Sequence, residues 1–333
     1  MRIGLVGVGR IGALHAATLS GLTAVDELII ADADAGRAKE IAGQLGARVA
    51  DTAEDLFSAG IDALVVASPT ATHPGLIRRG VTATVPVFCE KPVAPDAAGT
   101  LDVIEATAGS SVPVQIGFQR RFDPGFAAAR NAAMTGTLGW LHTIRSTTFD
   151  PAPPPAGYIA GSGGIFRDCA VHDFDSIRWA TGREVTQVFA TGSNRGEDFF
   201  RDAGDVDSAS AVLTLDDGTI ALVSCTRYNA AGYDVRLELF GSRSSVVAGM
   251  DGRTPLLSTE PGAGSTPSRA HRQFTDRFRL AYIAELSAFT EVAAGKAPSP
   301  CTPGDALEAF YVAEACELSR RRNAPVAIEE VRR

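Results

Sequence analysis

Arg2 to Gly12 reads RIGLVGVGRIG, and this stretch decides the fold. Residues 2–6 form a mostly apolar run typical of a buried strand, and a helix-like segment follows Gly12. The glycines between them complete a G-x-G-x-x-G pattern. Such glycines allow a tight turn and a close backbone approach to a pyrophosphate at the helix N-terminus. The stretch therefore predicts a dinucleotide-binding unit. Its expected cofactor residues are Gly7, Gly9, Arg10, Ile11 and Gly12.

A second apolar run, Glu27 to Ala31, ends at Asp32. This acid stands about 20 residues beyond the glycine pattern, where dinucleotide-binding folds place the carboxylate that binds the adenosine ribose. A carboxylate there repels a 2′-phosphate, so we expect NAD in preference to NADP. Arg37 lies a turn into the next predicted helix. We count it among the cofactor residues, with a surface ion pair as the alternative.

Strand-like and helix-like segments alternate up to residue 117, which predicts a parallel, doubly wound sheet. Polar residues follow two of the strands, at the edge where such sheets bind ligands. One group follows the strand at 63–67 and the other follows the strand at 85–89. The candidate cofactor residues there are Ser68, Pro69, His73, Glu90 and Lys91.

Two of these candidates have plainer alternatives. His73 starts a predicted helix, so a surface histidine is the favoured alternative to a cofactor contact. Lys91 would project over the nicotinamide end of a bound dinucleotide, whereas Glu90-Lys91-Pro92 taken alone is an exposed turn. Pro92 permits a cis peptide bond that would aim the preceding residue.

The alternation stops near Arg120 and Arg121, where the sequence predicts a boundary between a Rossmann domain, 1–120, and a second α/β domain, 121–333. One of these arginines could reach a substrate, or both could be solvated. Strand-like segments at 141–149, 185–191, 209–215, 220–227 and 235–241 predict a large open, mostly antiparallel sheet. A loop rich in proline and glycine, 150–164, leads into the next motif.

Asp168 and His172 stand four residues apart in the stretch DCAVHDFD, residues 168–175, and so share one face of a predicted helix. Oxidation of an alcohol by hydride transfer needs a base for the hydroxyl proton and a cation or donor at the oxygen. His172 suits the first role because imidazole titrates near neutral pH. Lys91 suits the second, and Asp168 could orient the imidazole or bind a substrate hydroxyl. The structural alternative is an N-cap at Asp168 and a core histidine at His172.

The same stretch could suggest a metal site that also uses Asp173 and Asp175. We expect no metal, because the adjacent residues His172 and Asp173 point in different directions on a helix.

Composition narrows the class of protein. The 333 residues suggest two domains, and the net charge of −8 argues against nucleic acid or an anionic membrane as partner. No apolar run approaches the roughly 18 residues that span a bilayer. The five cysteines are scattered without a CxxC pair, which argues against a disulfide framework or a zinc site. We expect a soluble, cytoplasmic protein.

Taken in order, several stretches resemble the Gfo/Idh/MocA oxidoreductases and, within them, the bacterial inositol 2-dehydrogenases. The resemblance runs nearly end to end. It is carried by GVGRIG with Asp32, CEKP at 89–92, VQIGFQRRFD at 114–123, SGGIFRDCAVHDFD at 162–175 and GYDVRLELFG at 232–241.

The resemblance implies a Rossmann domain followed by an α/β domain whose open sheet forms a homodimer or homotetramer. It implies that Lys91, Asp168 and His172 are catalytic and contact the substrate, with His172 as general base, and that Arg120 and Tyr233 line a polyol pocket. Gln119 takes a place that often holds another side chain. The prolines at 151–155 also depart from some inositol enzymes, and this leaves the substrate open.

The leading hypothesis is therefore NAD-dependent oxidation of a secondary hydroxyl of a cyclic polyol or sugar, foremost myo-inositol to its 2-keto product. The N-terminal domain would supply the lysine and the C-terminal domain the base. One alternative keeps the chemistry with another sugar or an anhydrosugar. The other is a dinucleotide-sensing regulator without turnover, which has no need of a base.

Overall fold

The computed structural model describes residues 1–262 and 269–332. The chain forms two compact units. The first comprises Met1–Gln119 and Leu280–Leu307, and the second comprises Arg120–Arg279 and the segment from Glu308 onward. The predicted ranges, 1–120 and 121–333, did not include the return of the chain to the first unit at Leu280–Leu307. The return has a physical cause, since Leu286 and Phe289 are fully buried in the apolar core of the first unit.

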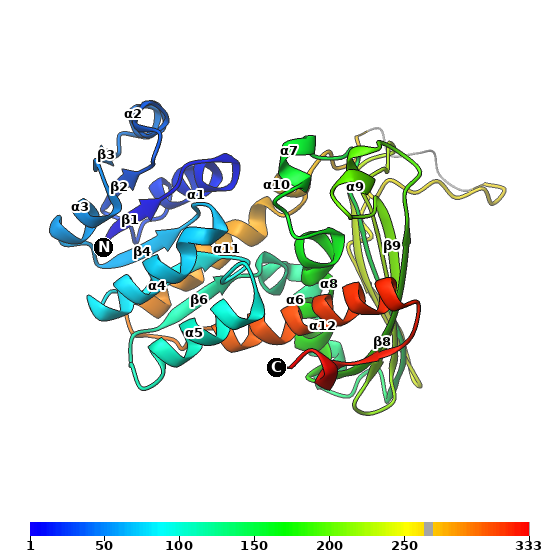
Figure 1. Ribbon diagram of the computed structural model, residues 1–333. Helices are drawn as coiled ribbons and strands as arrows, with labels where there is room; N and C mark the ends of the chain where they lie inside the picture. Colours follow the sequence, from blue (N-terminus) through cyan, green and yellow to red (C-terminus); the bar gives the residue numbers. More distant parts are fainter. Residues whose placement is uncertain (263–268, 333) are drawn as a thin grey trace. The chain divides into compact units, whose positions relative to one another are not determined.

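The first unit is built on a parallel sheet in the order β3-β2-β1-β4-β5-β6 (Figure 1). This is the doubly wound order, with its switch point between β1 and β4. It confirms the predicted Rossmann fold. The strands are β1 (Arg2–Val6), β2 (Glu27–Ala31), β3 (Arg48–Val49), β4 (Ala63–Val66), β5 (Val87–Glu90) and β6 (Val114–Gly117). The helices are α1 (Arg10–Ser20), α2 (Ala35–Leu45), α3 (Ala53–Ser58), α4 (His73–Thr82), α5 (Ala97–Thr107) and most of α11 (Arg279–Ala293).

Local sequence accounts for these elements. β4 is an unbroken apolar run, and all four of its residues are buried. This is expected for a parallel strand covered on both faces. Asp34 caps α2 by accepting hydrogen bonds from the backbone N–H groups of Gly36 and Arg37. Thr52 and Asp55 form a capping box at the start of α3.

The second unit contains a sheet in the order β12-β11-β7-β10-β9-β8-β13. Among the described strands of this second sheet, only the β7–β10 pair is parallel. The prediction of a mostly antiparallel sheet is therefore confirmed. The short strands β12 and β13 were not predicted. The strands are β7 (Leu141–Phe149), β8 (Val185–Ser193), β9 (Ser208–Leu215), β10 (Ile220–Thr226), β11 (Asp234–Gly241), β12 (Ser245–Ala248) and β13 (Val326–Ala327).

Helices cover one face of this sheet, and the opposite face is open (Figure 1). In β10, Val223 and Cys225 are buried, whereas Ile220 and Leu222 are exposed on the other face. The covering helices are α6 (Pro124–Met134), α8 (Val171–Thr181) and the later part of α12 (Pro303–Arg322). Shorter helices are α7 (Ala156–Ile159), α9 (Phe199–Asp202) and α10 (Phe274–Arg277). Among the described residues, none of the helices is both long enough and apolar enough to cross a membrane.

Candidate active site

The glycine turn of the first unit leaves room for an anion. An added Cβ at Gly12 would lie 2.0 Å from the carbonyl oxygen of Gly7, and one at Gly7, where φ is +90°, would lie 2.6 Å from the backbone of Ser68. These two glycines therefore allow β1, α1 and the turn after β4 to pack closely. At Gly9 an added Cβ would meet nothing within 4 Å. The turn thus opens at Gly9, just before Arg10 and Ile11 start α1, and the N-terminus of that helix suits a pyrophosphate.

Asp32 lies directly after β2 and is tied to the same turn. Its Oδ2 accepts a hydrogen bond from the backbone N–H of Val8 at 2.7 Å, and its Oδ1 accepts one from Asp34 at 2.8 Å. Arg37 reaches Asp34 at 3.3 Å and Asp32 at 3.8 Å, with its side chain half exposed. Arg37 therefore makes the surface ion pairs that were its alternative. The role of Asp32 as the ribose-binding acid stays a prediction.

His73 starts α4 as predicted, but it is not a surface residue, because only 1% of it is exposed. Its Nδ1 lies 2.8 Å from the carbonyl oxygen of Pro92, and its Nε2 lies 2.8 Å from that of Ser68. One ring thus joins the turn after β4 to the turn after β5. The prediction missed this burial because a polar residue at a helix start is more often exposed.

Glu90, at the end of β5, is anchored from a third element. Its Oε1 lies 2.7 Å from Nε2 of His15 on α1, and His15 is fully buried, edge-on to Phe88. Lys91 follows immediately and is half-buried, and the Lys91–Pro92 peptide bond is cis. The cis bond that Pro92 was expected to permit is present, and the place of Lys91 beside the nicotinamide stays a prediction. His15 was not predicted, although it lies only three residues after Gly12.

Asp168 and His172 lie in adjoining helical turns of different kinds. Phe166–Ala170 forms a π-helical turn, and α8 begins at Val171. The prediction of one regular helix is therefore wrong at Asp168. The N-cap alternative is also wrong, because the N-cap positions of these turns are Ile165 and Ala170. His172 is half-buried, and Asp168 has its own polar partners.

These partners are Arg227 and Tyr158. The Nη2 of Arg227 donates to Oδ2 of Asp168 at 2.7 Å, and the Tyr158 hydroxyl donates to Oδ1 at 2.8 Å. The Nη1 of Arg227 donates to Asp150 at 2.9 Å. Neither Arg227 nor Tyr158 was predicted, because nothing in the local sequence relates them to Asp168. The carboxylate of Asp168 is thus held by a cation and a hydroxyl.

Arg120, at the start of the second unit in η2 (Gln119–Phe122), is buried with 2% of its surface exposed. It donates to Oδ1 of Asp173 at 3.0 Å, and Thr148 donates to Oδ2 of the same carboxylate at 2.7 Å. Burial alone lowers the pKa of Arg120, but the Asp173 carboxylate holds that pKa above its ordinary value. Arg121 forms a buried pair with Asp175. The alternative of two solvated arginines is therefore wrong.

Tyr233, the other residue expected at the polyol pocket, is also buried. Its ring is edge-on to Phe278 at 6.5 Å, and the guanidinium of Arg120 lies 5.8 Å from the same Phe278 ring. Burial raises the pKa of Tyr233 well above its ordinary value, so the hydroxyl stays protonated at neutral pH. The second unit thus gathers Arg120 and Tyr233 around one aromatic side chain.

Comparisons with known proteins agree with this architecture. Residues 1–118 match the model of the oxidoreductase family with an NAD-binding Rossmann fold, and residues 126–247 match that of the GFO/IDH/MocA C-terminal domain. The chain belongs to the Gfo/Idh/MocA oxidoreductase family. The resemblance predicted from its motifs is therefore confirmed.

Among its relatives, a myo-inositol dehydrogenase from Streptomyces leeuwenhoekii is 39% identical over 98% of this chain and 100% of its own length. A myo-inositol 2-dehydrogenase from Thermotoga maritima is 37% identical over 99% of both chains. The crystal structure of a scyllo-inositol dehydrogenase from Lactobacillus casei, with bound NAD(H) and scyllo-inositol, is 28% identical and covers 99% of both chains, with a TM-score of 0.88.

Proposed function

We propose that this oxidoreductase oxidises a secondary hydroxyl of a cyclic polyol with NAD, and that its substrate is myo-inositol, converted to the 2-keto product. The observation that carries the proposal is the Asp168–His172 pair. A half-buried histidine follows a carboxylate held by Arg227 and Tyr158, in a chain that also has the glycine turn and acid of an NAD-binding domain. The relatives named as inositol dehydrogenases support the same substrate class.

The residues of the first unit fit NAD. The open backbone at Gly9 and the start of α1 suit the pyrophosphate, and the carboxylate of Asp32 suits the ribose hydroxyls. Ser68, Pro69 and His73 after β4, and Glu90 and Lys91 after β5, would border the rest of the cofactor. When bound, NAD supplies the hydride acceptor.

The chain's own residues would supply the remaining chemistry. His172 takes the proton of the reacting hydroxyl, because a neutral imidazole is a competent base at neutral pH. Lys91 donates a hydrogen bond to the same oxygen and stabilises the charge that develops there. Asp168 accepts a hydrogen bond from a neighbouring substrate hydroxyl. Arg120 and Tyr233 would shape the pocket around the polyol.

Formation of NADH in a substrate panel tests this function. The purified protein is given NAD or NADP with myo-inositol, scyllo-inositol, pyranose aldoses and anhydrosugars. We expect the fastest turnover with NAD and an inositol. Turnover of a pyranose but of no inositol would mean that the substrate is a pyranose sugar. NAD binding without turnover of any polyol would contradict the proposed enzymatic activity and favour a dinucleotide sensor.

Lys91→Met is the matched variant for that panel. We expect NAD affinity to stay within a few fold, because the glycine turn and Asp32 are untouched, while turnover falls by about 10²- to 10⁴-fold. Parallel measurements of NAD binding and of kcat separate the two effects. An equal loss in both would assign Lys91 a structural role.

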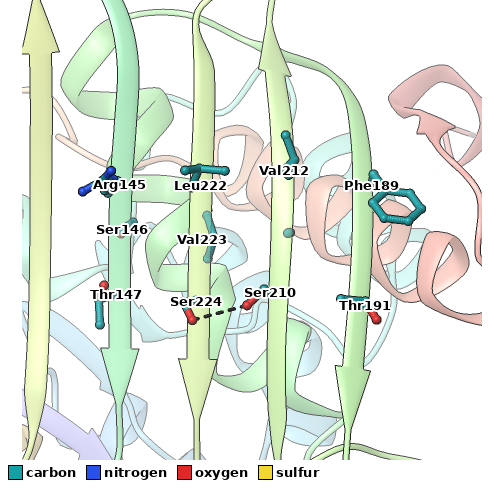
Figure 2. A pocket seen from close by; sticks show the side chains of 11 residues that line it. Arg145, Ser146, Thr147, Phe189, Thr191, Ser210, Val212, Leu222, Val223 and Ser224 are labelled. Carbon is teal, nitrogen blue, oxygen red and sulfur yellow. Dashed lines mark hydrogen bonds between the residues drawn. The ribbon is translucent and has the colours of Figure 1, made fainter.

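We further propose that the open face of the second unit's sheet binds another copy of the chain, giving a homodimer or homotetramer. Arg145, Leu222, Val212 and Phe189 lie in a row across β7, β10, β9 and β8 (Figure 2). They border a hollow of about 330 Å³, with hydroxyl side chains in the next row. Leu222, Val212 and Phe189 are each more than a third exposed. An exposed face of this kind, apolar at its centre, suits a symmetric partner.

Light scattering on Leu222→Glu tests the assembly, since a buried carboxylate in the interface would drive the protein toward monomer. Met134→Glu is the control, because Met134 is also exposed and apolar but lies on α6. A wild-type monomer, or an unchanged mass for Leu222→Glu, would contradict this interface. All five cysteines are buried and free, which is compatible with the cytoplasm that we propose as the compartment.

A further inference from the structure

Arg227 owes its position to the one parallel strand pair in the described part of the second sheet. β7 and β10 run in register, with Phe149 opposite Thr226 at their ends. The next residue of each strand is therefore brought to the same edge, Asp150 from β7 and Arg227 from β10. The Asp150 backbone N–H continues the ladder by donating to the carbonyl oxygen of Thr226 at 2.9 Å. This register brings a cation and a carboxylate together beside the π-helical turn.

The guanidinium then holds two carboxylates at once. Its Nη1 donates to Oδ2 of Asp150 at 2.9 Å, and its Nη2 donates to Oδ2 of Asp168 at 2.7 Å. Only 4% of Arg227 is exposed. Water therefore screens these contacts weakly, and the planar fork of the guanidinium fixes where the Asp168 oxygen lies.

The second oxygen of Asp168 is held from the loop of residues 150–164. Tyr158, in α7, donates its hydroxyl to Oδ1 at 2.8 Å. A carboxylate that accepts from a guanidinium and a phenol is stabilised in its ionised form and is a weak base. A carboxylate offers about four acceptor sites, so accepting from these two donors is compatible with also accepting from a substrate hydroxyl. Asp168 is thus built to accept hydrogen bonds rather than to remove a proton.

We propose that Arg227 is the positioning residue of the catalytic pair: it keeps Asp168 ionised and oriented as a hydrogen-bond acceptor for the polyol, and so leaves proton removal to His172. The inference rests on the proposed polyol oxidation and adds to it the residue that keeps Asp168 an acceptor and His172 the base. Arg227 itself acts through Asp168.

The charged surroundings support this assignment. Burial alone lowers the pKa of Arg227, but Cys169, Asp168 and Asp150 hold that pKa well above its ordinary value, so the guanidinium stays charged. Burial raises the pKa of Asp150. Without the cation, Asp150 and Asp168 would face each other as two buried acids, and one would retain a proton near neutral pH. Among the described residues, the other titratable and charged groups that act on this cluster include Tyr158, Tyr233, Asp205 and Arg120.

The pH dependence of kcat/KM for the polyol tests the proposal. In the wild type one group, His172, must lose a proton. In Arg227→Met a second group must lose one as well, so the acid limb steepens and moves up by about 1–3 pH units. We expect kcat/KM at neutral pH to fall by about 10²-fold. NAD affinity, which belongs to the first unit, stays unchanged, and an unchanged circular dichroism spectrum shows that the second unit, which contains Arg227, is folded.

Asp150→Asn provides a second test. If Arg227 were purely structural, this substitution would not change the pH profile of Arg227→Met. Alone, it leaves the Arg227–Asp168 pair intact and keeps the wild-type pH profile. Combined with Arg227→Met, it removes the like charge beside Asp168, so the acid limb returns part of the way toward the wild type. Arg227→Lys keeps the positive charge but lacks the planar guanidinium with its two donors. Compared with Arg227→Met, it should restore the pH profile more fully than it restores kcat.

Arg178→Met is the control, because Arg178 also pairs with a carboxylate, Glu184, in the second unit. It should lower the melting temperature and leave the pH profile alone. A wild-type profile in Arg227→Met, or a double variant no different from Arg227→Met alone, overturns the role of Arg227 while polyol oxidation stands. A wild type that oxidises no polyol overturns the proposed function and this inference with it.

Discussion

The turn that carries Lys91 and the segment that carries Asp168 are held by different kinds of interaction. Around Lys91, two buried histidines contact two backbone carbonyls and one carboxylate. Around Asp168, buried arginines pair with carboxylates. The first arrangement depends on hydrogen-bond donors on a ring, and the second depends on charge. The two units should therefore respond differently to the same kind of substitution.

The largest effect is expected from Asp173→Asn in the second unit. This change leaves the charge of Arg120 buried without its carboxylate, which costs about 3–5 kcal/mol of unfolding free energy. Denaturant unfolding measures it. Asp198→Asn is the matched control, since Asp198 pairs with Arg201 on the surface, and its effect should stay within about 0.5 kcal/mol. Similar losses in both variants would contradict a charge-dependent second unit.

An intermediate effect is expected from His73 in the first unit. Asparagine can place an N–H near the position of Nδ1, facing Pro92, and glutamine can reach the position of Nε2, facing Ser68. If the Pro92 contact holds Lys91 in place, His73→Gln lowers kcat by about tenfold, the value of one hydrogen bond, and His73→Asn lowers it less.

The KM for NAD should change little in His73→Gln, which keeps the Ser68 contact, and should rise in His73→Asn only if the loss of that contact lets the Ser68 turn shift. Steady-state kinetics with the two variants side by side decide between these contacts. Equal losses of kcat in both variants, accompanied by equal falls in melting temperature, would make His73 merely structural.

The smallest effect is expected from Glu317→Gln on α12. Burial alone raises the pKa of Glu317, but Arg320 and Arg321 hold the net pKa below its ordinary value of 4.5. The pair therefore stabilises the fold at pH values above the ordinary pKa, and this contribution is lost as the pH falls through the lowered pKa. We expect a loss of about 1 kcal/mol or less near neutral pH.

Unfolding of Glu317→Gln and wild type across pH checks that sign. The difference between the two should shrink toward zero in acid. A difference that grows as the pH falls would contradict the ion pair as its source.

Much of the architecture was predictable because its causes are local. The glycine turn, the acid after β2 and the alternation of strands and helices each depend on residues close together in the sequence. The strands and helices of the first unit lie close to their predicted positions. The contacts of Arg227 were not predictable, since its partners Asp168 and Asp150 stand 59 and 77 residues away. The register of β7 with β10 brings Asp150 to Arg227, and the π-helical turn brings Asp168. For the same reason the sequence did not indicate that α11 joins the first unit, where its buried face determines its place.

The π-helical turn at Asp168 is another feature that spacing alone did not predict, because an i, i+4 pattern assumes a regular α-helix. The residue types still led to this segment as the candidate site. Sequence therefore located the candidate residues, whereas the structure supplied their partners.

The most direct test of the central claim follows the hydrogen itself. The wild-type protein is given NAD and myo-inositol carrying deuterium at carbon 2, and the reduced cofactor is analysed by mass spectrometry. The account predicts that the deuterium appears in NADH, with slower turnover than for unlabelled inositol if hydride transfer limits the rate. Reduced cofactor without the label would contradict oxidation at that carbon, and no reduction at all would contradict myo-inositol as the substrate.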